Sequence, residues 1–162
     1  MFPLFLLSAL GLVVSFAIHL SSFIPGRIVE MGQVWPMHVL IFPLFLIMIH
    51  RTNKDSTSGK QGSFPPADAP RWMSLLITVL FIYALVNFAM LLVHTYNGGP
   101  RRRDGKYVQQ NHGRVIKEIT ETEYNQLRAW EARGFSGHWM LFYSAPMAAF
   151  YAFWRRQKQP TP

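Results

Sequence analysis

This chain of 162 residues contains no cysteine. The absence excludes disulfide bonds, thiolate metal sites and thiol nucleophiles. It leaves histidine, carboxylate, hydroxyl and amide groups as the available chemistry. The sequence also lacks an H-x-x-x-H or H-E-x-x-H pair, a glycine-rich phosphate loop and a nucleophile elbow. No enzyme class is therefore indicated, and the sequence favours a protein that is not an enzyme.

Acidic residues are half as frequent as basic ones, with 8 Asp and Glu against 16 Lys and Arg. A net charge of +8 in a soluble protein can indicate nucleic-acid binding. Here the basic residues flank hydrophobic runs, so anionic lipid headgroups are the predicted contact and nucleic acid is not. The predicted headgroup contacts are Arg51, Arg71, Arg101, Arg102, Arg103, Arg155 and Arg156.

Hydrophobic residues make up 50% of the chain and gather in four stretches, at about 2–24, 34–50, 72–96 and 137–154. A helix needs about 20 apolar residues to cross a bilayer. The pattern predicts a single-domain, all-α integral membrane protein with four transmembrane helices in a bundle. We interpret the first stretch as a helix rather than a secretory signal, because it has no basic segment before it and no small-residue cleavage site after it.

Two connections between these stretches differ in character. Residues 52–70 show no apolar periodicity and are predicted to form a flexible loop. Residues 97–136 are predicted to form a small extramembrane insertion, in which Asn111-His112-Gly113 marks a hairpin turn between two short strands. Thr120 and Glu123 form a capping-box pattern for a short helix, which Gly134 is placed to end. The expected insertion is a ββα cap.

Lys and Arg are divided almost evenly between the two sides of the predicted bundle, so the positive-inside rule separates them only slightly. The distribution favours both termini on the cytoplasmic side. The sequence thus predicts a multi-pass protein of the bacterial inner membrane, with the lipid bilayer as its first partner.

Four histidines lie at the ends of predicted spans on the side of the cap: His19, His38, His94 and His138. Ser8, Gly11, Ser15, His19 and Ser22 recur at steps of three and four, which forms a small, polar stripe suited to close helix packing. On the third span Tyr83, Asn87 and His94 share one helix face. We expect the stripe, Asn87 and His94 to face the bundle interior.

These histidines allow several interpretations. They could be cofactor ligands, holding haem b or a transition metal with Tyr83 and Asn87 as supporting residues, or they could relay protons. They could also be interfacial side chains without a ligand. The leading hypothesis is an accessory or scaffold component of a membrane complex, which associates with other membrane subunits or with itself. The alternative is a histidine-ligated haem or metal redox protein.

Overall fold

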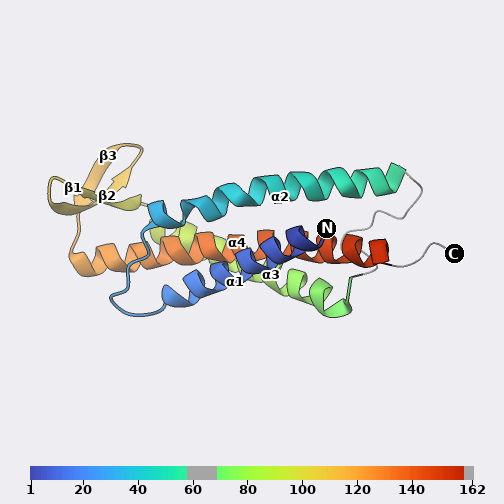
Figure 1. The fold of residues 1–162 in the computed structure, drawn as a ribbon. Coiled ribbons are helices and arrows are strands. Elements are labelled where there is room, and N and C mark those ends of the chain that lie inside the picture. The colour runs from blue at the N-terminus through green and yellow to red at the C-terminus, as the bar shows by residue number, and fades with distance from the viewer. Residues whose placement is uncertain (58–68, 159–162) are drawn as a thin grey trace.

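The computed structural model describes residues 1–57 and 69–158, and they are mostly helical. The helices are α1 (Phe2–Ser21), α2 (Met31–Thr57), α3 (Arg71–Thr95) and α4 (Glu121–Lys158). The strands are β1 (Gly99–Arg103), β2 (Lys106–Asn111) and β3 (Arg114–Glu118), all between α3 and α4. The first turns of α1 and the last turns of α4 lie toward one end of the molecule, and the sheet lies at the other (Figure 1).

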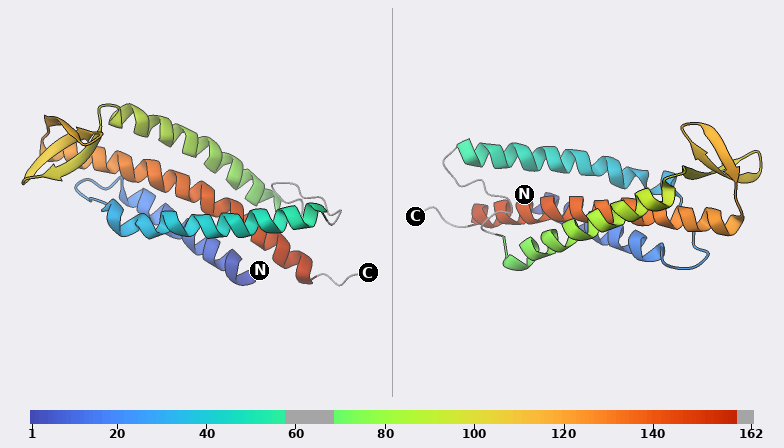
Figure 2. Two further views of the ribbon diagram at one scale, coloured as in Figure 1. Left: turned by 90° about the horizontal axis from the view of Figure 1, so that it is seen from above. Right: turned by 180° about the vertical axis from the view of Figure 1, so that it is seen from behind.

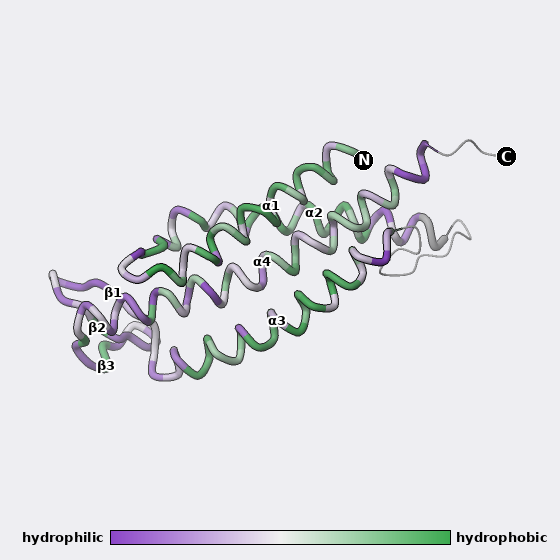
Figure 3. Tube along the Cα trace, turned by 90° about the horizontal axis from the view of Figure 1, so that it is seen from below, coloured by the Kyte–Doolittle hydropathy of each residue, from purple (hydrophilic) through white to green (hydrophobic). Residues whose placement is uncertain are grey.

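Helices α1, α2 and α3 are long and apolar enough to cross a membrane. In their most apolar windows only 22%, 17% and 17% of the residues are buried within the protein. Most of their apolar side chains therefore face outward, as expected for helices surrounded by lipid tails. Figure 3 shows the hydropathy along the chain. Helices α1 and α3 are largely hydrophobic, whereas the sheet is largely hydrophilic. These helices confirm the prediction of a multi-pass membrane protein.

The last helix differs from the prediction. Residues 121–158 form one continuous helix, so the short cap helix and the fourth predicted span are two halves of α4. Gly134 does not end the first half. It lies where α4 approaches α3 so closely that a side chain at this position would meet Leu91. The glycine therefore allows close packing of α4 on α3 and does not form a C-cap. The structure does not show α4 as a fourth transmembrane helix.

Helix α4 contacts each of the other three helices, and α1, α2 and α3 are arranged around it (Figure 2). Its bundle half carries fully buried Trp139, Tyr143 and Phe150. Facing it on α1 is the predicted polar stripe, in which Ser8 and Ser15 are completely buried. Gly11 lies against the ring of Tyr143. Small residues on α1 thus allow large aromatic residues of α4 to occupy the centre, which confirms the inward direction of the stripe.

The sheet between α3 and α4 has three antiparallel strands in the order β1-β2-β3, one more than predicted. The expected hairpin is present, with His112 and Gly113 in left-handed backbone conformations between β2 and β3. A second turn at Asp104-Gly105 joins β1 to β2 in the same way. Asp-Gly is a strong hairpin signal that the sequence interpretation missed, and the adjacent arginines are consequently part of a strand.

Helix boundaries otherwise differ from the predicted ones by up to seven residues. Helix α1 ends at Ser21 and a short turn follows, whereas α2 begins at Met31 and continues to Thr57. The first residues of the predicted flexible loop thus extend α2. Residues 58–68 of that loop lie outside the described part of the chain.

Candidate functional site

A buried histidine joins three helices near the sheet end of the bundle. The Nδ1 atom of His19 on α1 lies 2.9 Å from Oγ of Ser136 on α4, and its Nε2 atom lies 2.5 Å from the hydroxyl of Tyr83 on α3. His19 is 3% exposed and Ser136 is completely buried. We call these three residues the His19 cluster.

The other hydrogen bonds of these residues determine which atom of the His19 cluster carries each proton. The Ser136 hydroxyl donates to the backbone carbonyl of Ala132, so its oxygen is left to accept a hydrogen bond. His19 then donates from Nδ1 to Ser136 and accepts at Nε2 from the Tyr83 hydroxyl. With His19 in this one neutral tautomer, every polar group of the cluster has a hydrogen-bond partner.

The His19 cluster is suited to fastening helices together. A buried polar group without a partner would be costly, and here each polar atom is paired across a helix interface. Ser136 is buried and its proton is held by a helix carbonyl, so the arrangement does not present it as a nucleophile. Asn87, one turn along α3 from Tyr83, donates to the Tyr83 backbone carbonyl and packs against Gly137.

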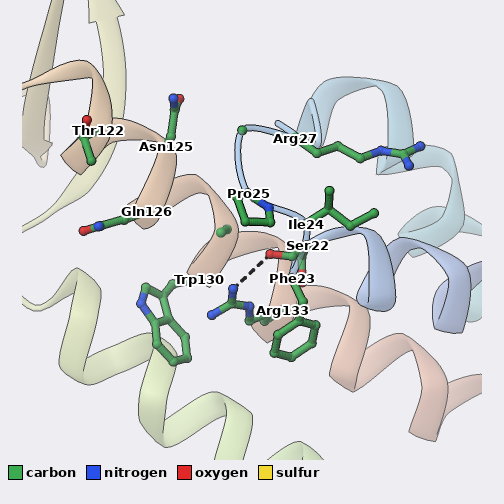
Figure 4. A pocket seen from close by; sticks show the side chains of 12 residues that line it. Ser22, Phe23, Ile24, Pro25, Arg27, Thr122, Asn125, Gln126, Trp130 and Arg133 are labelled. Atoms are coloured by element: carbon green, nitrogen blue, oxygen red, sulfur yellow. Dashed lines mark hydrogen bonds between the residues drawn. The ribbon is translucent and has the colours of Figure 1, made fainter.

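Next to this cluster, a pocket of about 460 Å³ lies between the turn after α1 and the first half of α4 (Figure 4). Arg133 extends into it and donates from Nη2 to the backbone carbonyl of Ser22 at 2.9 Å. The guanidinium carbon of Arg133 lies 4.3 Å from the ring centre of Phe23 and 4.7 Å from that of Trp130. We call this the Arg133 pocket.

The Arg133 pocket is cationic. Its lining includes Arg27 and Arg133, and among the described residues no Asp or Glu lines it. The buried Nε atom of Arg133 has no hydrogen-bond partner among the described residues, nor has Oδ1 of Asn125. Burial lowers the pKa of Arg133 below its ordinary value, because removal from water disfavours the charged form. The neighbouring carboxylates Glu30 and Glu131 instead pair with Arg128.

A second cavity of about 420 Å³ runs along α1 and α3 within the apolar part of the bundle. Leu12, Phe16, Leu76 and Leu80 are among its lining residues, and Met140 of α4 also contributes. His19 and Tyr83 line it as well, but they are hydrogen-bonded to each other. Phe23 lines both this cavity and the Arg133 pocket. We call the second cavity the α1–α3 groove.

The other predicted histidines have different partners. His38 accepts a hydrogen bond at Nδ1 from the Trp139 indole and stacks on Trp35. His94 stacks on Trp130 at 3.9 Å between ring centres, in agreement with its predicted inward direction.

His138 donates from Nδ1 to the Gly134 carbonyl, and its ring lies edge-on to Phe88. The structure thus unites His19 with Tyr83, but it does not bring the four histidines to one point. Across residues 1–57 and 69–158, His, Asp and Glu side chains form no group of three or more with metal-binding geometry. The hypothesis of a haem or metal site stays a prediction.

The predicted headgroup contacts fall into two sets. Arg51, Arg71, Arg155 and Arg156 lie on the helices at the end opposite the sheet. The other set, Arg101, Arg102 and Arg103, forms part of β1. The Nη1 atom of Arg101 lies 3.7 Å from Oε1 of Glu131, and Arg102 donates from Nη2 to the Tyr107 hydroxyl. The Nε atom of Arg103 lies 3.7 Å from Oδ2 of Asp104. Their contact with lipid headgroups stays a prediction.

Sequence reasoning assigned Ser136, Arg133 and Trp130 to no site. Ser136 was missed because the predicted helix ended at Gly134, which separated this residue from the first half of α4. The available signal was the absence of proline from residue 121 to residue 145, together with apolar and small residues at helical spacing across the assumed break. Comparisons with family models, curated proteins and solved structures find no match to this chain.

Proposed function

We propose that this chain is an accessory or scaffold subunit of a membrane complex. It would lie in the bacterial inner membrane with both termini in the cytoplasm and with α4 as a fourth span. The observation that carries the proposal is strand β3. All five of its residues are exposed, and they include the apolar side chains Val115 and Ile116.

Strand β3 is an edge of the sheet, and no other strand in the described part of the chain pairs with its outer side. An exposed edge offers unpaired backbone groups to a strand of another protein, and apolar side chains add affinity. Soluble proteins usually protect such edges. The edge of β3 therefore favours a partner subunit or a second copy of this chain.

Helix α4 provides a firm connection between this edge and the membrane helices. Its first half lies beneath the sheet, where Val108 is buried and Tyr107 packs on Tyr124 at 4.8 Å between ring centres. Its second half is the centre of the bundle. A partner bound at β3 would thus be held at a fixed position relative to the membrane, as a scaffold requires.

Site-specific crosslinking tests the proposal. A photoreactive residue at Ile116 should give one crosslinked species in native membranes, whereas the same residue at Arg103 on the opposite edge strand should not. A product twice the mass of the 18.7 kDa chain would identify self-association, and any other discrete mass would identify a different subunit. Absence of a crosslink at Ile116, with a single chain per detergent micelle, would show that the proposal is wrong.

The absence of cysteine makes the topology directly measurable, because single cysteines can be introduced into an unlabelled background. We expect R103C in the sheet and K158C at the end of α4 to react with a membrane-impermeant maleimide from opposite sides of the membrane. Labelling of both from the same side would show that α4 does not cross. Labelling of R103C from the periplasm would support cytoplasmic termini.

A further inference from the structure

The Arg133 pocket and the α1–α3 groove form a polar and an apolar compartment that share Phe23. The polar compartment lies at the turn that follows α1, the level at which the chain leaves the apolar part of the bundle. The apolar compartment lies along α1 and α3, and Phe23 lines both compartments. A ligand that occupies both must have a polar end and an apolar end.

The polar compartment selects for negative charge. Arg133 is held between two aromatic rings, and one of its amino groups is fixed by the Ser22 carbonyl. In Figure 4 its guanidinium faces the space beside Trp130 and Gln126, while Arg27 extends outward at the rim. Placing this guanidinium costs little further entropy on binding, because its position is already determined. Guanidinium groups bind phosphate with strong, directional hydrogen bonds.

The apolar compartment has the character of an acyl-chain site. Leu12, Val13 and Phe16 form its α1 wall, and Leu76 and Leu80 form its α3 wall. The two polar side chains that reach it satisfy one another, so they require no hydrogen bond from a ligand. Both walls belong to helices that are long and apolar enough to span a membrane, where the surrounding medium would be lipid tails.

We propose that the Arg133 pocket and the α1–α3 groove together bind one anionic phospholipid, with its phosphate at Arg133 and an acyl chain along the groove. This is a specific site, distinct from the general headgroup contacts of basic residues at the membrane edge. Basic pockets beside transmembrane helices are a recognised setting for anionic headgroups. The proposal goes beyond the scaffold function and does not depend on a protein partner.

A test uses the full chain in nanodiscs of phosphatidylcholine that contain a small fraction of spin-labelled phosphatidylglycerol. The immobilised fraction of the labelled lipid measures binding, and spin-labelled phosphatidylcholine gives the reference. We expect R133Q to weaken phosphatidylglycerol binding about tenfold, the size typical for loss of a charge-assisted hydrogen bond. L80W, which fills the groove without touching the cation, should also displace the lipid.

Two matched controls separate this site from nonspecific effects. K54Q removes a positive charge in the last turn of α2, at the other end of the bundle, and L75W enlarges an α3 side chain that is 65% exposed and outside the groove. Both should bind as the unchanged chain does. Equal immobilisation of both lipids in the unchanged chain, or unaltered binding in R133Q, would overturn the proposal.

The free anion is the alternative source of the same chemistry. If inorganic phosphate competes fully with the labelled lipid and L80W has no effect, the pocket is a simple anion site and the lipid proposal is wrong. Failure of phosphate to compete, together with loss of binding in L80W, supports the lipid. L80W keeps the Arg133 side chain and its hydrogen bond to the Ser22 carbonyl, so this result remains decisive even where R133Q fails to fold.

Discussion

His19 and Ser136 are 117 positions apart in the sequence, and a 2.9 Å hydrogen bond joins their side chains. The bond fixes α1 to α4 beside the point where Tyr83 of α3 reaches the same imidazole. Small residues on both sides of this point allow the helices to approach closely. The stability of the bundle should therefore respond both to its hydrogen bonds and to its small residues.

Removal of the Tyr83 hydroxyl should destabilise the bundle. In Y83F the Nε2 atom of His19 loses its donor, and an unpaired buried acceptor costs about 0.5–2 kcal/mol. Tyr96, which is 83% exposed, provides the control, because Y96F removes a solvent-accessible hydroxyl. Unfolding in mixed micelles measures both variants. Equal stability of Y83F and Y96F would show that the His19 cluster contributes nothing to the fold.

A methyl group at Gly11 should also destabilise the protein. In G11A the added carbon would overlap the ring of Tyr143, which is completely buried and cannot move freely. Overpacking of this kind costs about 1–3 kcal/mol. Gly32 in α2 has open space around it, so G32A should be neutral or slightly stabilising in the same unfolding assay. A neutral G11A would contradict the close packing of α1 on α4.

Two glycines of α4 should respond differently to substitution by alanine. At Gly134 an added carbon would come within 2.6 Å of a Leu91 methyl group, whereas at Gly137 the nearest atom, Asn87 Cβ, is at 3.4 Å. We expect G134A to lower the free energy of unfolding by about 1–2 kcal/mol because Leu91 must shift. G137A should be tolerated. The reverse order in the unfolding assay would refute the described α3–α4 contact.

The start of α4 should depend on pH through Glu123. This carboxylate accepts hydrogen bonds from the backbone N–H and the hydroxyl of Thr120, which hold its pKa below the ordinary value of 4.5. A lowered pKa in the folded state means that the stabilisation is complete above about pH 4.5 and is lost as pH falls through the folded pKa. Lys117, 3.9 Å away, favours the same charged form.

Amide hydrogen exchange at Thr120 measures this effect, because its N–H is one of the donors. Corrected for intrinsic exchange, protection should fall as the solution becomes more acidic than pH 4.5. E123Q removes the titrating group and should abolish this pH dependence, while E121Q at the neighbouring position should retain it. A pH-independent protection factor in the unchanged chain would contradict the capping box.

Much of the local structure could be predicted from residues that are near one another in the sequence. The capping box at Thr120 and Glu123 is confirmed, as is the hairpin at His112-Gly113, because both depend on backbone geometry within a few residues. The burial of the α1 stripe was also predictable, since helical periodicity determines which side chains share a face. The Asp104-Gly105 turn carried an equally local signal that was overlooked.

The candidate sites were less accessible to sequence reasoning. Position at a helix end places a histidine at a depth in the bundle, but it does not determine rotation about the helix axis. His19 consequently meets Ser136 and Tyr83, whereas His38 and His94 meet tryptophans. Arg133 was missed because its importance comes from the absence of a carboxylate beside it, which depends on the folding of the turn after α1.

The sequence by itself determined that this is a multi-pass membrane protein, in which three of the four predicted apolar helices are confirmed, and that a capped helix follows a strand hairpin. Length, hydropathy and turn chemistry are properties of continuous segments, so they can be inferred without the fold. Only the tertiary structure decided that α4 is one helix at the centre, that Gly134 serves packing, and that Phe23 and Trp130 enclose Arg133. These features depend on which helix faces meet, and the packing of the whole bundle determines that choice.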